Sequence, residues 1–185
     1  TDSDLKNRAT YTTDGFIDAS TNKHFYAGYD IDYSAIFKYT IDRENGTVTI
    51  DSFNWEETYY VSLTELFIPR TIELYPVTKI ADRFIYITMN DPNFEDFSLS
   101  MASFTSIRFE EGSEVTYIGS DSFNAISTLK KLELPSKLTY IGDNAFASTY
   151  ISGELVIPAT VQKIGENAFR YMNYNLKNVT FEGDS

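Results

Sequence analysis

The nine residues LTYIGDNAF, Leu138–Phe146, decide the fold of this chain because they recur along it at a fixed interval. The same motif returns downstream as VQKIGENAF, ending at Phe169, and lies upstream as VTYIGSDSF, ending at Phe123. The step from one phenylalanine to the next is 23 residues, and the glycines Gly119, Gly142 and Gly165 keep it. A fixed period of about 20 to 50 residues is typical of solenoid arrays. We therefore interpret the motif as a structural repeat and not as a catalytic signature.

A short apolar alternation precedes each copy of the motif and predicts a half-buried β-strand. In the stretch Leu132-Glu133-Leu134, the period of two points both leucines to one face and Glu133 to the other. Pro135 then ends the pairing, because proline donates no N–H to a neighbouring strand. The equivalent alternations of the other copies are Ile107-Arg-Phe109, Leu155-Val-Ile157 and Val179-Thr-Phe181. Each copy predicts one coil, and several coils must stack to share a core.

The positions of the motif have separate predicted roles. The core positions are predicted to be Leu138, Ile141, Ala145 and Phe146. Gly142 is predicted to supply a backbone conformation, or a close approach of two chains, that a Cβ would hinder. Asp143 or Asn144 is predicted to begin a short turn of helix, because a side-chain oxygen there accepts a hydrogen bond from an exposed N–H.

A degenerate first copy and a hairpin precede the clear repeats. Leu66-Phe-Ile-Pro69 matches the strand, and VTKIADRF, ending at Phe84, matches the motif with Ala81 in place of the glycine. Phe84 and Ile107 are 23 residues apart, whereas Phe123 and Leu132 are separated by only 9, which predicts an insertion at about 85–103. Upstream, FKYTIDRENGTVTI alternates about an Asn-Gly pair and predicts a β-hairpin. We expect residues 1–65 to form an N-terminal segment and hairpin cap, and 66–185 the array.

The strand and motif together resemble the repeats of the BspA-like leucine-rich-repeat family, which run approximately as L-x-x-I-x-L-P-x-x-L-x-x-I-G-x-x-A-F. The match is carried by LKKLELPSKLTYIGDNAF (129–146), GELVIPATVQKIGENAF (153–169) and FTSIRFEEGSEVTYIGSDSF (104–123). Members often have a cysteine shortly after the phenylalanine, where this chain has Ile126, Thr149 and Met172. The resemblance implies a mainly β leucine-rich-repeat solenoid of right-handed coils of about 23 residues, with the hairpin as its N-terminal cap.

Composition excludes several kinds of partner and site. Asp and Glu outnumber Lys and Arg by 27 to 15, and the formal charge of −12 opposes binding to nucleic acid or to an anionic membrane surface. The chain has no cysteine, which excludes disulfides, thiolate metal sites and a cysteine nucleophile. It has no run of 18 apolar residues, so we expect no direct membrane insertion.

Candidate catalytic and metal-binding residues are few. His24 is the only histidine, and it lies in the least regular segment, so a catalytic dyad or triad would depend on it alone. The acid-rich stretches YDIDY (29–33) and NDPNFEDF (90–97) offer oxygen ligands to calcium but lack the spacing of an EF-hand loop. We interpret them as solvated loops and expect no catalytic residue, no cofactor and no metal ion.

Two rows of outward side chains are the candidate partner-binding sites. The residues before the motif isoleucines are Lys79, Tyr117, Tyr140 and Lys163. If neighbouring coils pair in register, the two tyrosines lie side by side with a lysine at each end, either as a self-contact that stiffens the surface or as a platform for a sugar ring or a partner loop. The strand face forms a second row of Phe67, Arg108, Glu133, Val156 and Thr180, in which Arg108 and Glu133 are candidate binding residues.

The family resemblance, rather than composition, implies a function. It implies a non-enzymatic bacterial cell-surface or secreted protein without a cofactor. Such a protein would contact a protein or glycan on a host or matrix surface in an adhesion-like role, as a monomer. Alternatives are a glycan-binding module, a carbohydrate-active enzyme that uses paired carboxylates, and a structural spacer. We expect a leader peptide to be absent from this chain. Because LKNVTFEGDS at 176–185 parallels FTSIRFEEGS, the chain is expected to stop inside a repeat.

Overall fold

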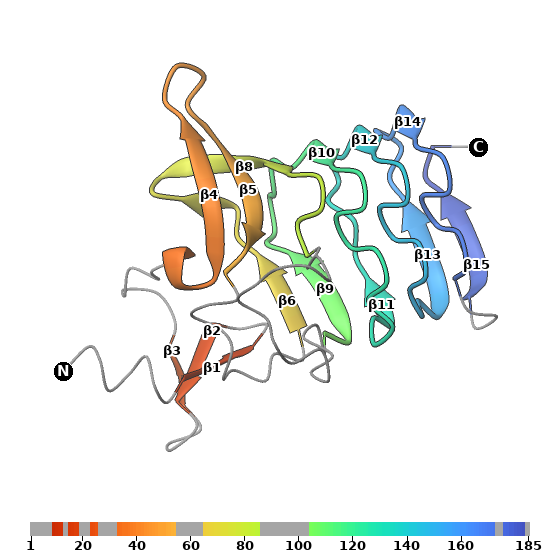
Figure 1. The fold of residues 1–185 in the computed structure, drawn as a ribbon, viewed down its shortest axis with the longest axis horizontal. Coiled ribbons are helices and arrows are strands. Elements are labelled where there is room, and N and C mark those ends of the chain that lie inside the picture. Colours follow the sequence, from red (N-terminus) through yellow and green to blue (C-terminus); the bar gives the residue numbers. More distant parts are fainter. Residues whose placement is uncertain are drawn as a thin grey trace, which may run out of the picture.

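The computed structural model describes residues 9–12, 15–18, 23–25, 33–54, 65–85, 104–172 and 176–183, the first three of these ranges as backbone only. The chain winds as a row of stacked coils that runs from the hairpin of β4 (Phe37–Asp42) and β5 (Thr47–Phe53) to the strand β15 (Leu176–Phe181) (Figure 1). One short 3-10 helix, η1 (Tyr33–Ala35), precedes the hairpin, and the regular elements of the described residues are otherwise strands. The predicted mainly β leucine-rich-repeat solenoid is confirmed.

Each coil contributes one strand to each of two rows. The first row is parallel, with the order β8 (Tyr75–Ile80), β10 (Tyr117–Ile118), β12 (Tyr140–Ile141) and β14 (Lys163–Ile164). The second row, which we call the strand face, holds β6 (Glu65–Ile68), β9 (Ser106–Phe109), β11 (Lys131–Leu132), β13 (Gly153–Ile157) and β15 (Leu176–Phe181). We number the coils 1 to 4 from β6–β8, β9–β10, β11–β12 and β13–β14, and β15 begins coil 5.

The hairpin joins the array through one of its own strands. β4 (Phe37–Asp42) and β5 (Thr47–Phe53) pair antiparallel, as predicted, and Gly46 takes a φ of 64° in the turn between them. The Asp42 carboxylate accepts hydrogen bonds from the N–H groups of Glu44 and Asn45, both at 3.0 Å, and so holds the turn. β5 then pairs parallel with β8, so the hairpin lies against coil 1 at the start of the first row.

A small antiparallel sheet precedes the hairpin and was not predicted. It contains β1 (Ala9–Thr12), β2 (Gly15–Asp18) and β3 (Lys23–Phe25), in that order. This segment shows no sustained apolar period in the sequence, which is why it gave no strand prediction. The predicted insertion begins at Ile85, which is buried, but its remaining residues, 86–103, lie outside the described part of the chain.

A column of phenylalanines runs through the core from coil to coil. Phe123 and Phe146 are fully buried, and their rings stack with centroids 5.2 Å apart and planes at 9°. Phe146 stacks in the same way on Phe169 at 5.5 Å, while Phe84 meets Phe123 edge-on at 5.4 Å. Phe37 of the hairpin packs on Phe84 at 6.0 Å, so the column continues into the cap. Each motif therefore adds one ring to a continuous aromatic core.

The motif glycines mark the closest approach between coils. A Cβ on Gly142 would lie 2.4 Å from the backbone nitrogen of Ser120 and 2.5 Å from the carbonyl carbon of Gly119, both in the preceding coil. Gly119 and Gly165 have equally short approaches to the coils before them. Of the two roles predicted for Gly142, the close approach of two chains is confirmed by these short distances. The other role, a special backbone conformation, does not apply, because φ of Gly142 is not in the left-handed region. Ala81 replaces the glycine in coil 1, where the preceding neighbour is the extended strand β5, whose Ile50 carbonyl accepts from the Ala81 N–H.

The helical turn predicted after the glycine is wrong. The residues that follow Gly142 form a turn in which Asn144 takes a φ of 53°, and Asp121 and Asn167 occupy the same left-handed conformation in their coils. Asn and Asp tolerate this conformation better than other residues with a side chain. The Asp143 carboxylate does not cap its own coil but accepts from the N–H of Glu166 in the next coil at 2.8 Å. The polar residues of the motif therefore connect coils.

A two-residue turn in coil 1 carries an exposed leucine. β7 (Thr71–Ile72) pairs antiparallel with the start of β8, and the turn residues Glu73 and Leu74 have φ values of 50° and 70°. Leu74 is 95% exposed, and Glu73 accepts a hydrogen bond from the hydroxyl of Tyr39 at 2.8 Å. Two-residue hairpin turns favour Asn-Gly, whereas the Asn45-Gly46 pair of this chain lies in the longer loop between Asp42 of β4 and Thr47 of β5.

Coils 4 and 5 expose positions whose counterparts in the coil before are buried. Val179 and Phe181 pair with Leu155 and Ile157 of β13, yet they are 47% and 51% exposed, whereas Leu155 and Ile157 are buried. Ile164 of β14 is 37% exposed, and its counterpart Ile141 is fully buried. β15 is therefore a strand of the array and not a separate closing element. No helix among the described residues is long and apolar enough to cross a membrane.

Candidate functional site

The predicted row of lysines and tyrosines forms one continuous ladder across the first row of strands. Tyr117 pairs with Lys79 on one side and with Tyr140 on the other, and Tyr140 pairs with Lys163. The predicted register is confirmed, because the motif isoleucines beside these residues pair in the same order. We call Lys79, Tyr117, Tyr140 and Lys163 the lysine–tyrosine ladder. Both tyrosines are half-buried and both lysines are exposed.

The two tyrosine rings cover each other's faces. Their centroids are 4.7 Å apart and their planes differ by 1°, so each ring hides one face from solvent. The Lys163 ammonium nitrogen lies 5.4 Å from the centroid of Tyr140, within the range of a cation–π contact with the other face. The ladder therefore presents ring edges, hydroxyl groups and ammonium groups to a partner.

An aspartate of coil 1 holds one end of the ladder. The Asp82 carboxylate accepts a hydrogen bond from the Ser120 N–H at 2.8 Å and lies 3.4 Å from the Tyr117 hydroxyl, which donates to it. Partial burial, followed by the charge of Asp82, raises the pKa of Tyr117 above its ordinary value of 10.0. Sequence reasoning missed Asp82, although its position after Ile80-Ala81 matches Asp143 after Ile141-Gly142 and was a usable signal.

The raised pKa of Tyr117 gives a testable pH dependence. Because the folded state holds this proton more tightly than the unfolded chain, its contribution to stability is present below pH 10.0 and is lost as the pH rises through the folded value. In Asp82→Asn the negative charge disappears, and we expect the pKa of Tyr117 to fall toward 10.0. The difference in tyrosinate absorbance between each protein and its Tyr117→Phe counterpart measures this pKa. An unchanged pKa in Asp82→Asn would contradict the assigned role of Asp82.

The candidate residues of the strand face contact the preceding coil. The Arg108 guanidinium Nε lies 3.3 Å from the Glu65 carboxylate, and its Cζ lies 5.2 Å from the centroid of the Phe67 ring. The register of β9 and β11 places Glu133 beside Arg108, as predicted. Sequence reasoning missed Glu65 as a partner of Arg108. The strand face and the lysine–tyrosine ladder belong to different rows, so the six candidate residues form two separate sites.

A groove interrupts the strand face between coils 3 and 4. It has a volume of about 400 Å³ and is lined by Leu132, Glu133, Leu134, Ser136, Glu154, Val156, Pro158 and Glu182. Volumes of about 300 to 1,000 Å³ are typical of ligand-binding clefts. Of the predicted residues, Glu133 and Val156 face this groove. The groove itself was not predicted, because it depends on how far two strands separate and not on which residues they contain.

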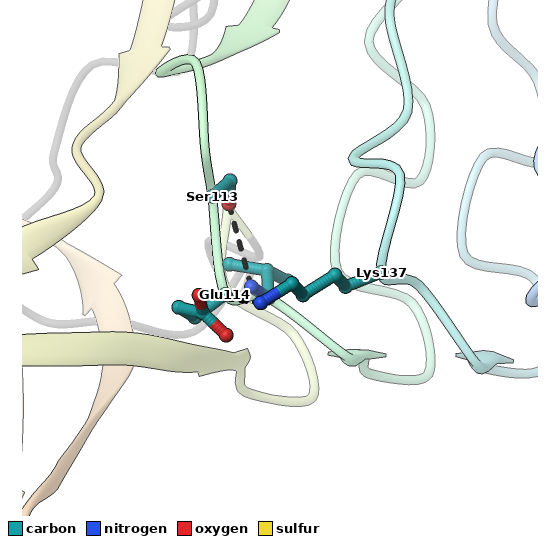
Figure 2. Close-up of polar contacts among 4 residues, drawn as sticks. Ser113, Glu114 and Lys137 are labelled. Carbon is teal, nitrogen blue, oxygen red and sulfur yellow. Dashed lines mark hydrogen bonds and ion pairs between the residues drawn. The ribbon is translucent and has the colours of Figure 1, made fainter.

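The loops that follow the strands tie coils 2 and 3 together. The Lys137 ammonium lies 2.6 Å from the Glu114 carboxylate, and the Ser113 hydroxyl accepts from the Val115 N–H at 3.3 Å (Figure 2). The two charged side chains are 54% and 42% exposed, so their ion pair contributes little to stability. Thr160 stands at the position of Lys137 in coil 4, where its hydroxyl donates to the Ser136 carbonyl at 2.8 Å.

The described residues bring together no group of three or more His, Asp or Glu side chains that would hold a metal ion. His24 lies in β3, of which the backbone alone is described. The stretch 90–97 lies outside the described part of the chain, as does 29–33 except for Tyr33. Burial, followed by the charge of Glu110, raises the pKa of Tyr33 to about 12.

Parallel strand rows, a repeating buried aromatic and stacked coils of one period define a leucine-rich-repeat solenoid. The model of the family described as the BspA type leucine rich repeat region matches residues 85–184 in 6 copies. The chain belongs to this family, and the resemblance found in the motif is confirmed. No curated protein matches the chain.

Two solved structures have a similar fold. A leucine-rich repeat protein from Bacteroides capillosus is similar with a TM-score of 0.58 and 26% identity, over 80% of this chain and 96% of that one. The leucine-rich repeat protein of T. pallidum is similar with a TM-score of 0.51 and 18% identity, over 80% of this chain and 81% of that one. The second likeness concerns the fold alone.

Proposed function

We propose that this BspA-type repeat protein is a non-enzymatic, cell-surface or secreted binding protein that contacts other proteins in an adhesion-like role. The extracellular or surface location rests on its family, whose repeats generally serve as non-catalytic scaffolds. The net charge of −12 is consistent with a partner other than nucleic acid.

One observation carries the choice of a protein partner: three of the four tyrosine ring faces of the lysine–tyrosine ladder are already covered. A sugar ring that binds by stacking needs a free aromatic face, but Tyr117 and Tyr140 cover each other at 4.7 Å and Lys163 lies over Tyr140. Tyrosine edges and hydroxyls on a rigid support are instead typical of protein interfaces, in which tyrosine is enriched at the energetically important positions. The ladder is rigid because each of its residues belongs to a paired strand.

The experiment compares proteins and glycans as partners of one chain. The purified protein is screened against immobilised extracellular-matrix and host-surface proteins and, in parallel, against a glycan array. We expect protein partners whose binding weakens in Tyr140→Ala and is retained in Tyr150→Ala, a tyrosine of the same coil that is 44% exposed and outside the ladder. Glycan binding that depends on Tyr140, without a protein partner, would overturn the proposal in favour of a glycan-binding module.

A further inference from the structure

The groove in the strand face exists because the hydrogen bonding between strands stops there. β9 pairs with β11, and β13 pairs with β15 over its whole length, but β11 and β13 are not paired. Coils 3 and 4 are joined at one end, where the Ser152 N–H donates to the Lys130 carbonyl at 3.0 Å. They are joined again at the other end, through Thr160 and Ser136. Within the described residues, no backbone hydrogen bond joins the two coils between these points.

The floor of this groove is apolar and partly exposed. Val156 points outward from β13 and is 38% exposed, and Leu134 is half-buried on the opposite side. Leu132 and Pro158 complete the apolar lining and are themselves buried. Val156 and Leu134 therefore offer an apolar surface, between two extended segments, over which the side chains of a further extended chain can lie.

The rim of the groove is acidic, and its carboxylates form no ion pair within the described part of the chain. Glu133, Glu154 and Glu182 are all exposed, and none forms an ion pair with a Lys or Arg of the described residues. The Glu154 carboxylate accepts one hydrogen bond, from the Thr180 hydroxyl at 2.9 Å. By contrast, Arg108 and Glu65 neutralise each other on the same face in coils 1 and 2. The charge at the groove therefore complements a cationic ligand.

We propose that this groove, bounded by β11 and β13, is a docking site for an extended segment of a partner protein that alternates apolar residues with Lys or Arg. The apolar side chains lie over Val156 and Leu134, and the cations reach Glu133, Glu154 and Glu182. This inference rests on the proposed function only in that the partner is a protein. It uses a surface separate from the lysine–tyrosine ladder, so either site can fail without the other.

The test uses a defined peptide as its probe. A fluorescein-labelled, end-capped octapeptide of alternating Val and Lys is titrated with the whole chain, and the dissociation constant is measured by fluorescence anisotropy. We expect binding that weakens as salt is added and that is absent for the matching peptide of alternating Val and Glu. Equal binding of both peptides would overturn the proposal, and so would an absence of binding to the Val-Lys peptide.

Variants of equal net charge show whether peptide binding depends on the carboxylates of the groove or on the overall negative charge of the chain. The double variant Glu133→Gln with Glu154→Gln is expected to weaken binding about tenfold, as two exposed ion pairs would. The matched control is Glu44→Gln with Glu166→Gln, two exposed carboxylates outside the groove lining, and it should change binding by less than about twofold at moderate salt. Equal weakening of peptide binding in the two double variants would show that the net charge of the chain causes the binding, and would overturn the proposed docking site.

Two further variants complete the test. Val156→Lys places a cation in the groove itself and is expected to abolish binding, while urea unfolding shows whether the variant still folds. If Val156→Lys does not fold, the double variant Glu133→Gln with Glu154→Gln decides the outcome, because Glu→Gln changes at exposed positions leave the core intact. Tyr140→Ala is expected to leave peptide binding unchanged, so a failed ladder and a failed groove give different results.

Discussion

Gly142→Ala is expected to destabilise the folded chain by on the order of 3–5 kcal/mol, a large part of the stability of a domain of this size. The new Cβ would lie 2.4 Å from the Ser120 nitrogen and 2.5 Å from the Gly119 carbonyl carbon. Both contacts are with backbone of the preceding coil, which cannot rotate away as a side chain would. Coils 2 and 3 must then separate, and the hydrogen bond from the Gly142 N–H to the Ile118 carbonyl, at 2.8 Å, lengthens with them. Urea unfolding followed by circular dichroism measures the loss.

Gly153→Ala is the matched control for this prediction. Gly153 has a φ of 81°, which costs an alanine about 1 kcal/mol, but a Cβ there would meet no atom within 4 Å. We therefore expect a small loss for Gly153→Ala and a large one for Gly142→Ala, although Gly142 is the residue with the ordinary backbone conformation. Equal losses would show that the coils can move apart at little cost, contrary to the contacts described above.

The second large effect is expected for Phe146→Ala, with a loss of about 3–5 kcal/mol. Phe146 is fully buried, and its ring lies between Phe123 at 5.2 Å and Phe169 at 5.5 Å. Removing it leaves a cavity between two coils that the hydrogen-bonded turns around it hold at a fixed separation. The Phe146 N–H and carbonyl keep their partners, Ala168 and Thr149, so the loss reports on the ring alone. Chemical denaturation gives the free energy of unfolding.

Phe169→Ala provides the comparison for Phe146. Phe169 makes the same stacked contact on one side only and is half-buried, so its loss is expected to be about 1–2 kcal/mol. Conversely, a loss for Phe169→Ala as large as that for Phe146→Ala would mean that coil 4 is as tightly enclosed as coil 3. That outcome is incompatible with the exposure of Ile164 beside it.

Most of the architecture was predictable because each copy of the repeat gives independent evidence for the same local structure. One copy of Ile-Gly-x-x-Ala-Phe is a weak signal, but three copies at a step of 23 fix which residues face the core and which residues stack on one another. The lysine–tyrosine ladder followed from this step alone, since in-register pairing puts equivalent residues side by side. The same reasoning placed the degenerate coil 1 in the array, where β6 and β8 indeed pair with coil 2.

Most of the features that escaped prediction do not repeat along the chain, and the conformation of Asn144, which recurs at Asp121 and Asn167, is the exception. The sheet β1–β3 has no counterpart elsewhere in the described part of the chain, and the turn at Glu73-Leu74 uses residues that turn statistics disfavour. The left-handed conformation of Asn144 was misread because Asn favours both the start of a helix and this conformation, and the sequence does not separate the two. The groove depends on the spacing of β11 and β13, which residue identity does not determine.

The strand β5 has a consequence for the order in which the chain folds. It pairs with β4 through a turn of a few residues and with β8 through the pair Ile50 and Ile80, whereas in the first row coils 2, 3 and 4 pair with one another at a step of 23 residues. Short loops close fastest, so we expect the hairpin to form early and to offer coil 1 an edge on which to pair. In that order of events the antiparallel pair would act as a template from which parallel order spreads toward β15, one coil after another.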